Sequence, residues 1–459
     1  MQVMATRALL SFCKRGKKVF ENRGFDLIME AITVGSIECK GLAAAIIGVS
    51  ATGELKKGAN VEIERAVRLL KLLLKAEEAT CRERALGALV NTVLLHEQRN
   101  KVLTELLEDD ELLRLATFIE FLFEQATAGP TCGCQVLATS LLGQLVNNAS
   151  IRNLISTEER IKLICVMMEK GQTLEVRAAA AGFLWELAYS ARGSLVGRSL
   201  RNCVSSLVKC LTQGDAQVAR NAVGALASFA YKHEEAKNLI TGETDTIPTV
   251  VKMLTENTDP GVQVQACRLL WILADNHVVN QASIREAGAI PLLSKLLRKI
   301  DRQDIVVQAA WAISRLARKC RVNQDSMASP DLQIISSLVG LLKVQAGRGW
   351  EVVWEKAAHA LAEIANGHEG NQELIVKEEG VVEALVALLR SDTERQRVPI
   401  FAAMALRMLA EGNQGDARVI VKNKASLGLK ELRDSPLAMK NKQLKTAVEK
   451  ALRTLDLEN

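Results

Sequence analysis

The stretch REAGAIPLLSKLL (285–297), followed by IVVQAAWAISRLA (305–317), decides the fold of this chain. Gly288 fits the end of one helix, because glycine adopts a left-handed turn at little cost. Pro291 fits the first turn of the next helix, where its missing N–H is not needed for a hydrogen bond. The Ala-rich phrase at 305–317 has the apolar spacing of a further helix. The stretch therefore predicts three successive helices.

Both parts of this stretch recur along the chain. The part with the turn recurs at 21–32, 242–254, 329–342 and 377–389. The Ala-rich phrase recurs with the final residues Ser50, Val93, Val146, Ala188, Ala230, Ala274, Ala317, Ala365, Ala410 and Asp456, and a further copy opens the chain at 5–13. Successive final residues lie 42 to 53 positions apart, close to the roughly 40–47 residues of helical solenoid repeats. The two longest intervals predict insertions near 97–128 and 344–350.

The composition excludes several classes of protein. Hydrophobic residues make up 48% of the 459 residues, enough for a large core, so the chain is not disordered. Aromatic residues make up only 3%, and helix-forming residues dominate, so an all-β fold is not expected. Most of the ten cysteines are scattered singly, which suggests reduced thiols. With no membrane span or signal peptide in the sequence, the predicted location is intracellular, cytoplasmic or nuclear.

Motifs for catalysis or cofactor binding are absent from the sequence. It lacks a phosphate-binding loop, a dinucleotide-binding glycine motif after a strand, and a nucleophile elbow. Cys132 and Cys134 form a lone C-x-C without a second cysteine pair or a nearby histidine, so a zinc site is not expected. The sequence predicts a protein that is not an enzyme, with no catalytic residue, metal, cofactor or small-molecule substrate.

The pair GAIPLLSKLL (288–297) and IVVQAAWAISRLA (305–317) resembles the armadillo repeat. The resemblance extends over essentially the whole chain and is best over 176–412. It implies an all-α, right-handed superhelical solenoid, here of about ten repeats, in which the third helix of each repeat lines a concave groove. In that family, extended peptides or partner proteins lie in the groove. The resemblance thus implies a scaffold or adaptor that binds proteins.

The predicted domain organisation follows from stacking. A single repeat cannot bury its apolar side alone, so neighbouring repeats share one continuous core. We therefore expect a single solenoid over 1–459. Degenerate N-terminal repeats are predicted at 1–50, the main repeats at 51–412, and a basic C-terminal repeat or cap at 413–459.

A helical wheel of 305–317 separates two faces of the third helix. Ala309, Ala310, Ile313, Leu316 and Ala317 fall on one side and form the predicted stacking core. The opposite side mixes aromatic, basic and amide side chains, as recognition surfaces do. Across the repeats, this side supplies the predicted partner-binding residues Asn91, Glu186, Asn221, Ser228, Gln265, Arg268, Trp271, Gln308, Trp311, Arg315, Lys356, His359 and Glu363.

This face departs from the importin-α proteins, which resemble the chain in fold but carry a Trp and an Asn four residues apart in successive repeats. At the Trp position the chain holds Gly87, Ser140, Gly182, Gly224, Arg268, Trp311, His359 and Met404, so that array is largely absent. A nuclear-transport-type carrier requires an acidic and aromatic groove. Because the Trp array is largely absent, the carrier is kept only as an alternative interpretation. A second alternative is the substrate-binding part of a ubiquitin ligase whose U-box lies elsewhere.

The segment 418–453 is strongly basic, with ten Lys or Arg against three acidic residues. It either contacts an anionic partner or surface, or serves as the polar cap that the last repeat of a solenoid needs. The segment contains no aromatic residue, so stacking on nucleic-acid bases has no support.

Overall fold

The computed structural model describes residues 24–50, 70–71, 73–95, 112–191, 195–212, 215–255, 258–344, 349–390 and 397–457. Within these ranges every regular element is a helix, and no strand occurs. The predicted all-α class is therefore confirmed. The first copy of the repeat at 5–13 and parts of both predicted insertions lie outside the described residues.

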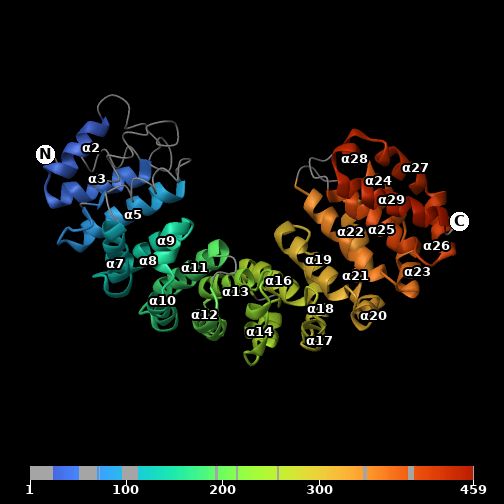
Figure 1. Cartoon of the computed structure of the whole chain (residues 1–459), viewed down its shortest axis with the longest axis horizontal. Coiled ribbons are helices and arrows are strands. Elements are labelled where there is room, and N and C mark those ends of the chain that lie inside the picture. The colour runs from blue at the N-terminus through green and yellow to red at the C-terminus, as the bar shows by residue number, and fades with distance from the viewer. Residues whose placement is uncertain are drawn as a thin grey trace. The chain divides into compact units, whose positions relative to one another are not determined.

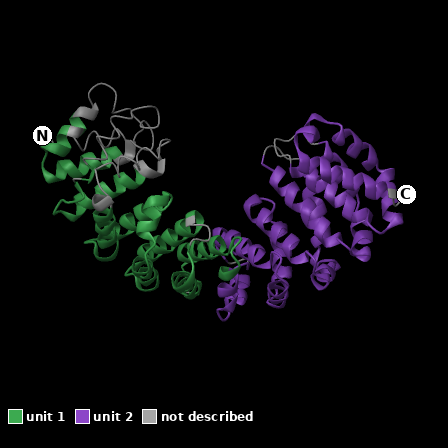
Figure 2. Cartoon of the chain, in the orientation of Figure 1, with its two compact units in different colours: residues 1–236 green, residues 237–459 purple. Residues whose placement is uncertain are grey.

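The chain divides into two compact units, unit 1 at residues 1–236 and unit 2 at residues 237–459 (Figure 2). The prediction of one domain over 1–459, with its internal boundaries, stays a prediction.

Unit 2 is built from sets of three helices, two short ones followed by a longer one (Figure 1). The longer third helices end at the residues that the repeat spacing predicted, among them Ala274 and Ala317. The helix α14 (Glu234–Gly242) spans the boundary between the units. The others are α15 (Thr246–Lys252), α16 (Pro260–Ala274), α17 (Val278–Glu286), α18 (Ala289–Leu297), α19 (Gln303–Ala317), α20 (Arg321–Met327), the 3-10 helix η2 (Pro330–Leu332), α21 (Ile334–Lys343), α22 (Glu351–Ala365), α23 (Glu369–Lys377), α24 (Val381–Leu389), α25 (Arg397–Ala410), α26 (Gln414–Lys422), α27 (Ala425–Arg433), α28 (Pro436–Lys440) and α29 (Lys442–Leu457).

Unit 1 follows the three-helix plan less regularly. Its helices are α2 (Gly24–Thr33), α3 (Ile37–Ser50), α5 (Ala79–Leu95), α7 (Leu112–Ala128), α8 (Cys132–Leu145), α9 (Ala149–Ile155), α10 (Glu158–Lys170), α11 (Leu174–Ala191), α12 (Gly197–Cys210) and α13 (Ala216–Ala230). In the repeat that ends in α13, the structure describes α12 and α13, and residues 192–194, between α11 and α12, lie outside the described ranges. Much of the predicted insertion near 97–128 is the regular helix α7, which packs against α8.

The turn before the second helix holds one residue in the left-handed conformation in repeat after repeat. Gly288 has a φ of 82° and Gly380 a φ of 72°, as the sequence predicted for Gly288. The same turn is left-handed at Asp245, Gln333 and Lys424. The left-handed conformation costs about 1–2 kcal/mol at a residue other than glycine. It persists there because the helices on both sides fix the course of the chain.

The stacking core lies between the third helices and the shorter ones. The helical wheel of 305–317 predicted one side of this helix to form the core. This prediction is confirmed, since that side is fully buried at Ala309, Ala310, Ile313, Leu316 and Ala317. Small alanines let the helix backbones approach closely, while Ile313 and Leu316 fill the space that remains.

A series of buried Asn-Gln pairs, which the sequence interpretation missed, ties the first helix of each repeat in unit 2 to the third helices of its own and of the preceding repeat. Gln324, on the first helix α20, donates from Nε2 to the carbonyl oxygens of Glu363 and Asn366, 2.8 and 3.0 Å away at the end of the next third helix. Gln281 and Gln372 make the same pair of bonds one repeat earlier and one later. These bonds satisfy carbonyls that the end of a helix leaves without intrahelical partners.

The asparagine before each of these glutamines bonds back to the third helix of the preceding repeat. Asn280, Asn323 and Asn371 donate from Nδ2 to the carbonyls of Leu273, Leu316 and Ile364. The pair Asn-Gln three residues after His277, Cys320 and His368 is the sequence signal that could have revealed the series. Each Asn-Gln pair thus ties one first helix to two third helices.

Candidate partner-binding face

Four rings on four successive third helices of unit 2 form a row, here called the ring row: Trp271 on α16, Trp311 on α19, His359 on α22 and Phe401 on α25. Trp271 and Trp311 meet edge to face, with ring centroids 5.7 Å apart. His359 lies 5.2 Å from Trp311 and 4.5 Å from Phe401, centroid to centroid. Trp271 also donates from Nε1 to Oε1 of Gln308, 3.0 Å away. The row thus runs across four repeats on the side of the helices that the sequence assigned to partner binding.

Two cations lie on the half-buried ring of Trp311. Nζ of Lys356 lies 3.4 Å from the ring centroid and Cζ of Arg315 lies 4.4 Å from it. Contacts of this kind are worth roughly 0.5–2 kcal/mol, more when water is excluded. Lys356 also contacts Oε1 of Glu355 at 2.8 Å. Burial lowers the pKa of Lys356, although the carboxylate of Glu355 opposes that effect.

His359 and Glu363 differ from the prediction, because both are buried, with 3% and 1% of their surface exposed. Burial lowers the pKa of His359, so the ring is neutral near pH 7. Oε1 of Glu363 lies 3.3 Å from Nε2, which therefore donates to it, and Nδ1 accepts from the hydroxyl of Ser314 at 2.9 Å. The helical wheel considers one helix alone, whereas in the structure the neighbouring third helices cover His359 and Glu363.

The acidic groups beside the ring row are paired with arginines. Burial acts to raise the pKa of Glu363, but the hydrogen bond from His359 and the charges of nearby arginines outweigh it and hold that pKa below its ordinary value. Arg318 lies 3.3 Å from Glu363, and Arg315 lies 3.4 Å from Asp275. These ion pairs neutralise both partners, so Glu363 and Asp275 leave no unpaired negative charge along the row.

Comparison with known proteins identifies the repeat. Residues 278–318 match the armadillo/beta-catenin-like repeat. The chain therefore contains an armadillo repeat, and its fold is that of an armadillo solenoid. Its structure resembles that of an engineered protein with a TM-score of 0.70 and 24% identity, over 94% of this chain and 98% of the other. A second engineered protein is similar with a TM-score of 0.50 and 26% identity, over 55% of this chain and 98% of that one.

A natural relative in structure comes from work on the interaction between cadherin and beta-catenin. The TM-score is 0.61 and the identity 16%, over 100% of this chain and 96% of the other. A likeness at this identity concerns the fold alone. No curated protein matches the chain by sequence.

The predicted residues in the earlier armadillo repeats lie in unit 1. Asn91 on α5 and Glu186 on α11 are half-buried. Asn221 and Ser228 on α13 are only 8% and 7% exposed, contrary to the open surface that the wheel predicted. Asn221 donates from Nδ2 to the carbonyl of Ala178, 2.9 Å away on α11, and so holds two repeats together. The Ser228 hydroxyl donates to the carbonyl of Gly224 at 2.9 Å.

The third helices of unit 1 enclose a hollow of about 390 Å³ where unit 2 has its ring row. Its lining comes from α8, α11 and α13 and includes Gln144, Gly182, Glu186, Gln217 and Asn221. This unit 1 hollow thus combines two of the predicted residues, Glu186 and Asn221, which α11 and α13 bring together.

The remaining predicted residues of the armadillo face are on α16 and α19 of unit 2. Gln265, Arg268, Trp271, Gln308, Trp311 and Arg315 are half-buried and reachable from solvent. Partner contact by these residues stays a prediction. Within the described ranges, no group of three or more His, Cys, Asp or Glu side chains is arranged to hold a metal ion. In the same ranges, no helix combines the length and apolarity needed to cross a membrane.

Proposed function

We propose that this armadillo-repeat chain is a non-catalytic scaffold, and that the ring row of unit 2 holds an extended segment of a partner protein. The observation that supports this most is the half-exposed Trp311, with Lys356 and Arg315 fixed against its ring. A large rigid ring and fixed cations lose little freedom on binding, so more of the contact energy appears as affinity. The partner segment presents an apolar anchor to the Trp311 ring, with polar residues on either side of that anchor.

Two other considerations support the scaffold. The one natural relative described above comes from a study of a protein–protein interaction, that of beta-catenin with cadherin. Seven of the nine described free cysteines are buried, in keeping with reduced thiols in the cytoplasm or nucleus. The carrier alternative is disfavoured, since the acidic groups beside the ring row are neutralised by arginines.

The proposal is tested by site-specific photo-crosslinking. A benzophenone amino acid replaces Gln308, beside the ring row, or Val279, a 68% exposed residue on the first helix α17. We expect crosslinks to peptides selected from a random displayed library at the Gln308 site and none at the Val279 site. Trp311→Ala should weaken the selected peptides about tenfold, since anchors of this kind contribute roughly 1–2 kcal/mol or more. Crosslinks at Val279 alone, or full binding by a folded Trp311→Ala variant, would contradict the proposal.

A further inference from the structure

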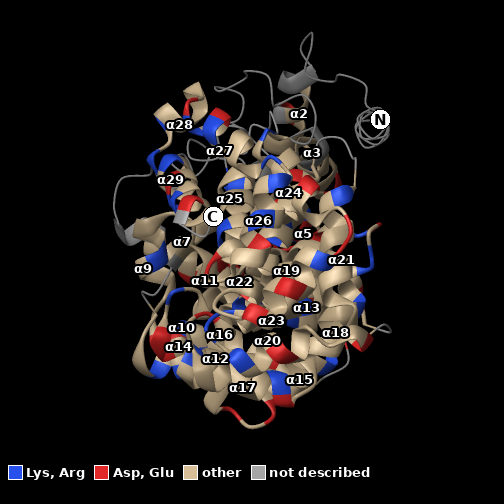
Figure 3. Ribbon diagram, turned by 90° about the vertical axis from the view of Figure 1, so that its right-hand side faces the viewer, with Lys and Arg blue, Asp and Glu red and all other residues tan. Residues whose placement is uncertain are grey.

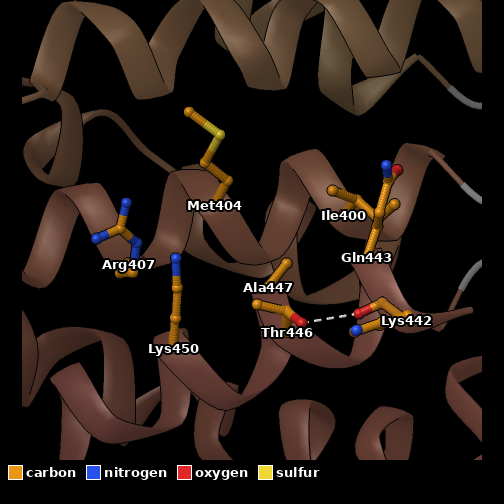
Figure 4. Close-up of a pocket in the computed structure, with 8 residues that line it drawn as sticks. All are labelled: Ile400, Met404, Arg407, Lys442, Gln443, Thr446, Ala447 and Lys450. Carbon is orange, nitrogen blue, oxygen red and sulfur yellow. Dashed lines mark hydrogen bonds between the residues drawn. The ribbon is translucent and has the colours of Figure 1, made fainter.

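A second hollow lies at the end of unit 2, between the adjacent third helices α25 and α29 (Figure 4). It has a volume of about 440 Å³, above the roughly 300 Å³ at which ligand pockets begin. The side chains of Ile400, Met404 and Ala447 supply its apolar part. We call it the C-terminal hollow. It can receive one large apolar side chain.

Every charged residue that lines the C-terminal hollow is a cation. Arg407 comes from α25, and Lys442 and Lys450 come from α29, where both lysines are exposed. Arg407 also pairs with Glu411 at 3.0 Å, outside the lining. Figure 4 shows Arg407 and Lys450 at one end of the hollow and Lys442 at the other. Lysines and arginines also colour α25 and α29 blue in Figure 3. The cations therefore bracket the apolar part from both ends.

We infer that the C-terminal hollow binds an acidic, extended protein segment through one bulky apolar side chain flanked by carboxylates. Lys442 and Lys450 are eight residues apart on one helix, so their backbones are about 12 Å apart at a rise of 1.5 Å per residue. An extended segment advances about 3.3 Å per residue, so its first and fifth residues are about 13 Å apart. The first, third and fifth side chains point to the same side. The ligand thus has acids at the first and fifth positions and the apolar residue at the third.

The chemistry of the lining favours a protein segment over other anionic ligands. None of the eight lining residues is aromatic, so nucleic-acid bases find no ring on which to stack. The apolar part is recessed between two helices, whereas a membrane surface needs apolar and basic groups that protrude from the protein. The inference rests on the proposed function, the binding of a protein segment along the third helices. None of the eight lining residues belongs to the ring row, so binding at the two places can be measured separately.

Fluorescence anisotropy with three five-residue peptides tests the inference on the full-length chain. The first peptide has Asp at its first and fifth positions and Phe at its third, with Gly between. The second moves the two acids to the second and fourth positions, which face the opposite way in an extended chain. The third replaces Phe by Gly. We expect the first peptide to bind at least about tenfold more tightly than either of the others. Equal binding by all three would overturn the inference.

Charge reversal on α29 provides matched variants. Lys442→Glu with Lys450→Glu should weaken the first peptide about tenfold or more. Lys445→Glu with Arg453→Glu changes the net charge by the same amount on the same helix, but at exposed residues outside the lining, and should have little effect. Ala447→Leu should also abolish binding by filling the hollow, while circular dichroism confirms that each variant is folded. Equal weakening by the two charge pairs would show unspecific attraction and overturn the inference.

Two further measurements distinguish peptide binding in the C-terminal hollow from binding at the ring row and from binding of a different anion. Trp311→Ala should leave binding of the first peptide unchanged, so that failure of the ring row and failure of the C-terminal hollow are distinguishable. Anionic vesicles and single-stranded RNA are added to the wild type in competition with the peptide. If either displaces it, and binds with the same dependence on Lys442 and Lys450, the anion rather than the protein segment is the ligand, and the inference is wrong.

Discussion

Unit 1 and unit 2 carry different residues at the position of the third helix where importin-α proteins have a Trp. Unit 1 places glycine there, at Gly182 and Gly224, and unit 2 places the rings of Trp311 and His359. Where glycine stands, the helix backbone is open to neighbouring side chains and to the unit 1 hollow. Where rings stand, they contact each other from repeat to repeat. At these four positions the residue type thus separates an open helix backbone from a packed ring.

The two units also differ in how their repeats are held together, and this difference yields the largest predicted effect. Gln324→Ala removes the donor that serves two carbonyls, from a residue only 3% exposed. At the same place after the helix cap, unit 1 has the half-buried Arg152 on α9, whose Nε donates to the carbonyl of Val146. Because the two carbonyls lose a buried partner, we expect a loss of about 2–3 kcal/mol. Native-state amide exchange in α20 and α22 measures it.

Gln414→Ala is the matched control for this change. Gln414 is exposed at the start of α26, so its loss should alter stability by less than about 0.5 kcal/mol. Equal effects from the two substitutions would mean that the buried Gln324 amide does not hold α20 to α22.

Gly224→Ala tests the glycine side of the comparison. A Cβ at this position would lie 2.7 Å from Cε2 of Trp185, whose ring packs on the backbone of α13. Since the ring must shift, we expect a loss of about 2 kcal/mol, as for other overpacked sites. Urea unfolding followed by circular dichroism measures it, and a neutral result would show that Trp185 moves freely.

Asp416→Asn should stabilise the last repeat of unit 2. Asp416 occupies the place of Asn280, Asn323 and Asn371, and burial raises its pKa to about 6. A raised pKa means that the folded chain holds the proton longer, so stability is lost as pH rises from about 4 to 6. The shift corresponds to at most about 3 kcal/mol, and with partial access of water we expect a gain of about 1–2 kcal/mol for the variant above pH 6.

The pH dependence is the control for this prediction. Near pH 3 the Asp416 carboxyl is mostly protonated in both the folded and the unfolded chain, so the advantage of the variant should largely disappear. Thermal unfolding at pH 3 and pH 7.5 distinguishes the two cases. A gain of the same size at both values would indicate packing rather than charge.

Gly87→Ala gives the smallest effect, with the opposite sign to Gly224→Ala at the same position of the repeat. A Cβ there would meet only Cδ1 of Leu137 at 3.6 Å, an ordinary contact. Alanine in a helix interior is favoured over glycine by about 1 kcal/mol, so a gain of about 0.5–1 kcal/mol is expected. A loss on urea unfolding would show that α5 is packed as tightly as α13.

The sequence alone predicted the parts of the fold that depend on local preference. Alanines and leucines at helical spacing predicted the third helices and their buried side, and Gly288 predicted a left-handed turn. The equivalent turns at Gln333 and Lys424 were not predictable, because their conformation is imposed by the neighbouring helices and not by the residue itself.

The candidate face was predicted less completely. Trp271, Trp311 and Arg315 are half-buried and accessible on it, but His359 and Glu363 are buried by neighbouring helices that a single helical wheel does not contain. The C-terminal hollow was missed because its charges gather only when α29 lies beside α25. Charge counts along 418–453 indicated the excess of cations but not their arrangement.

The glutamine bonds within each repeat have a direction. In each case the donor lies earlier in the chain than the carbonyls that it satisfies, as with Gln281 before Arg315 and Gln372 before Met408. Because a ribosome makes the N-terminal part first, each donor already exists when the helix that it caps is completed. The asparagine of each repeat bonds instead to a third helix that is already made, as Asn323 does to the carbonyl of Leu316. Folding can therefore advance repeat by repeat in the order of synthesis, each finished third helix serving as the template for the next repeat.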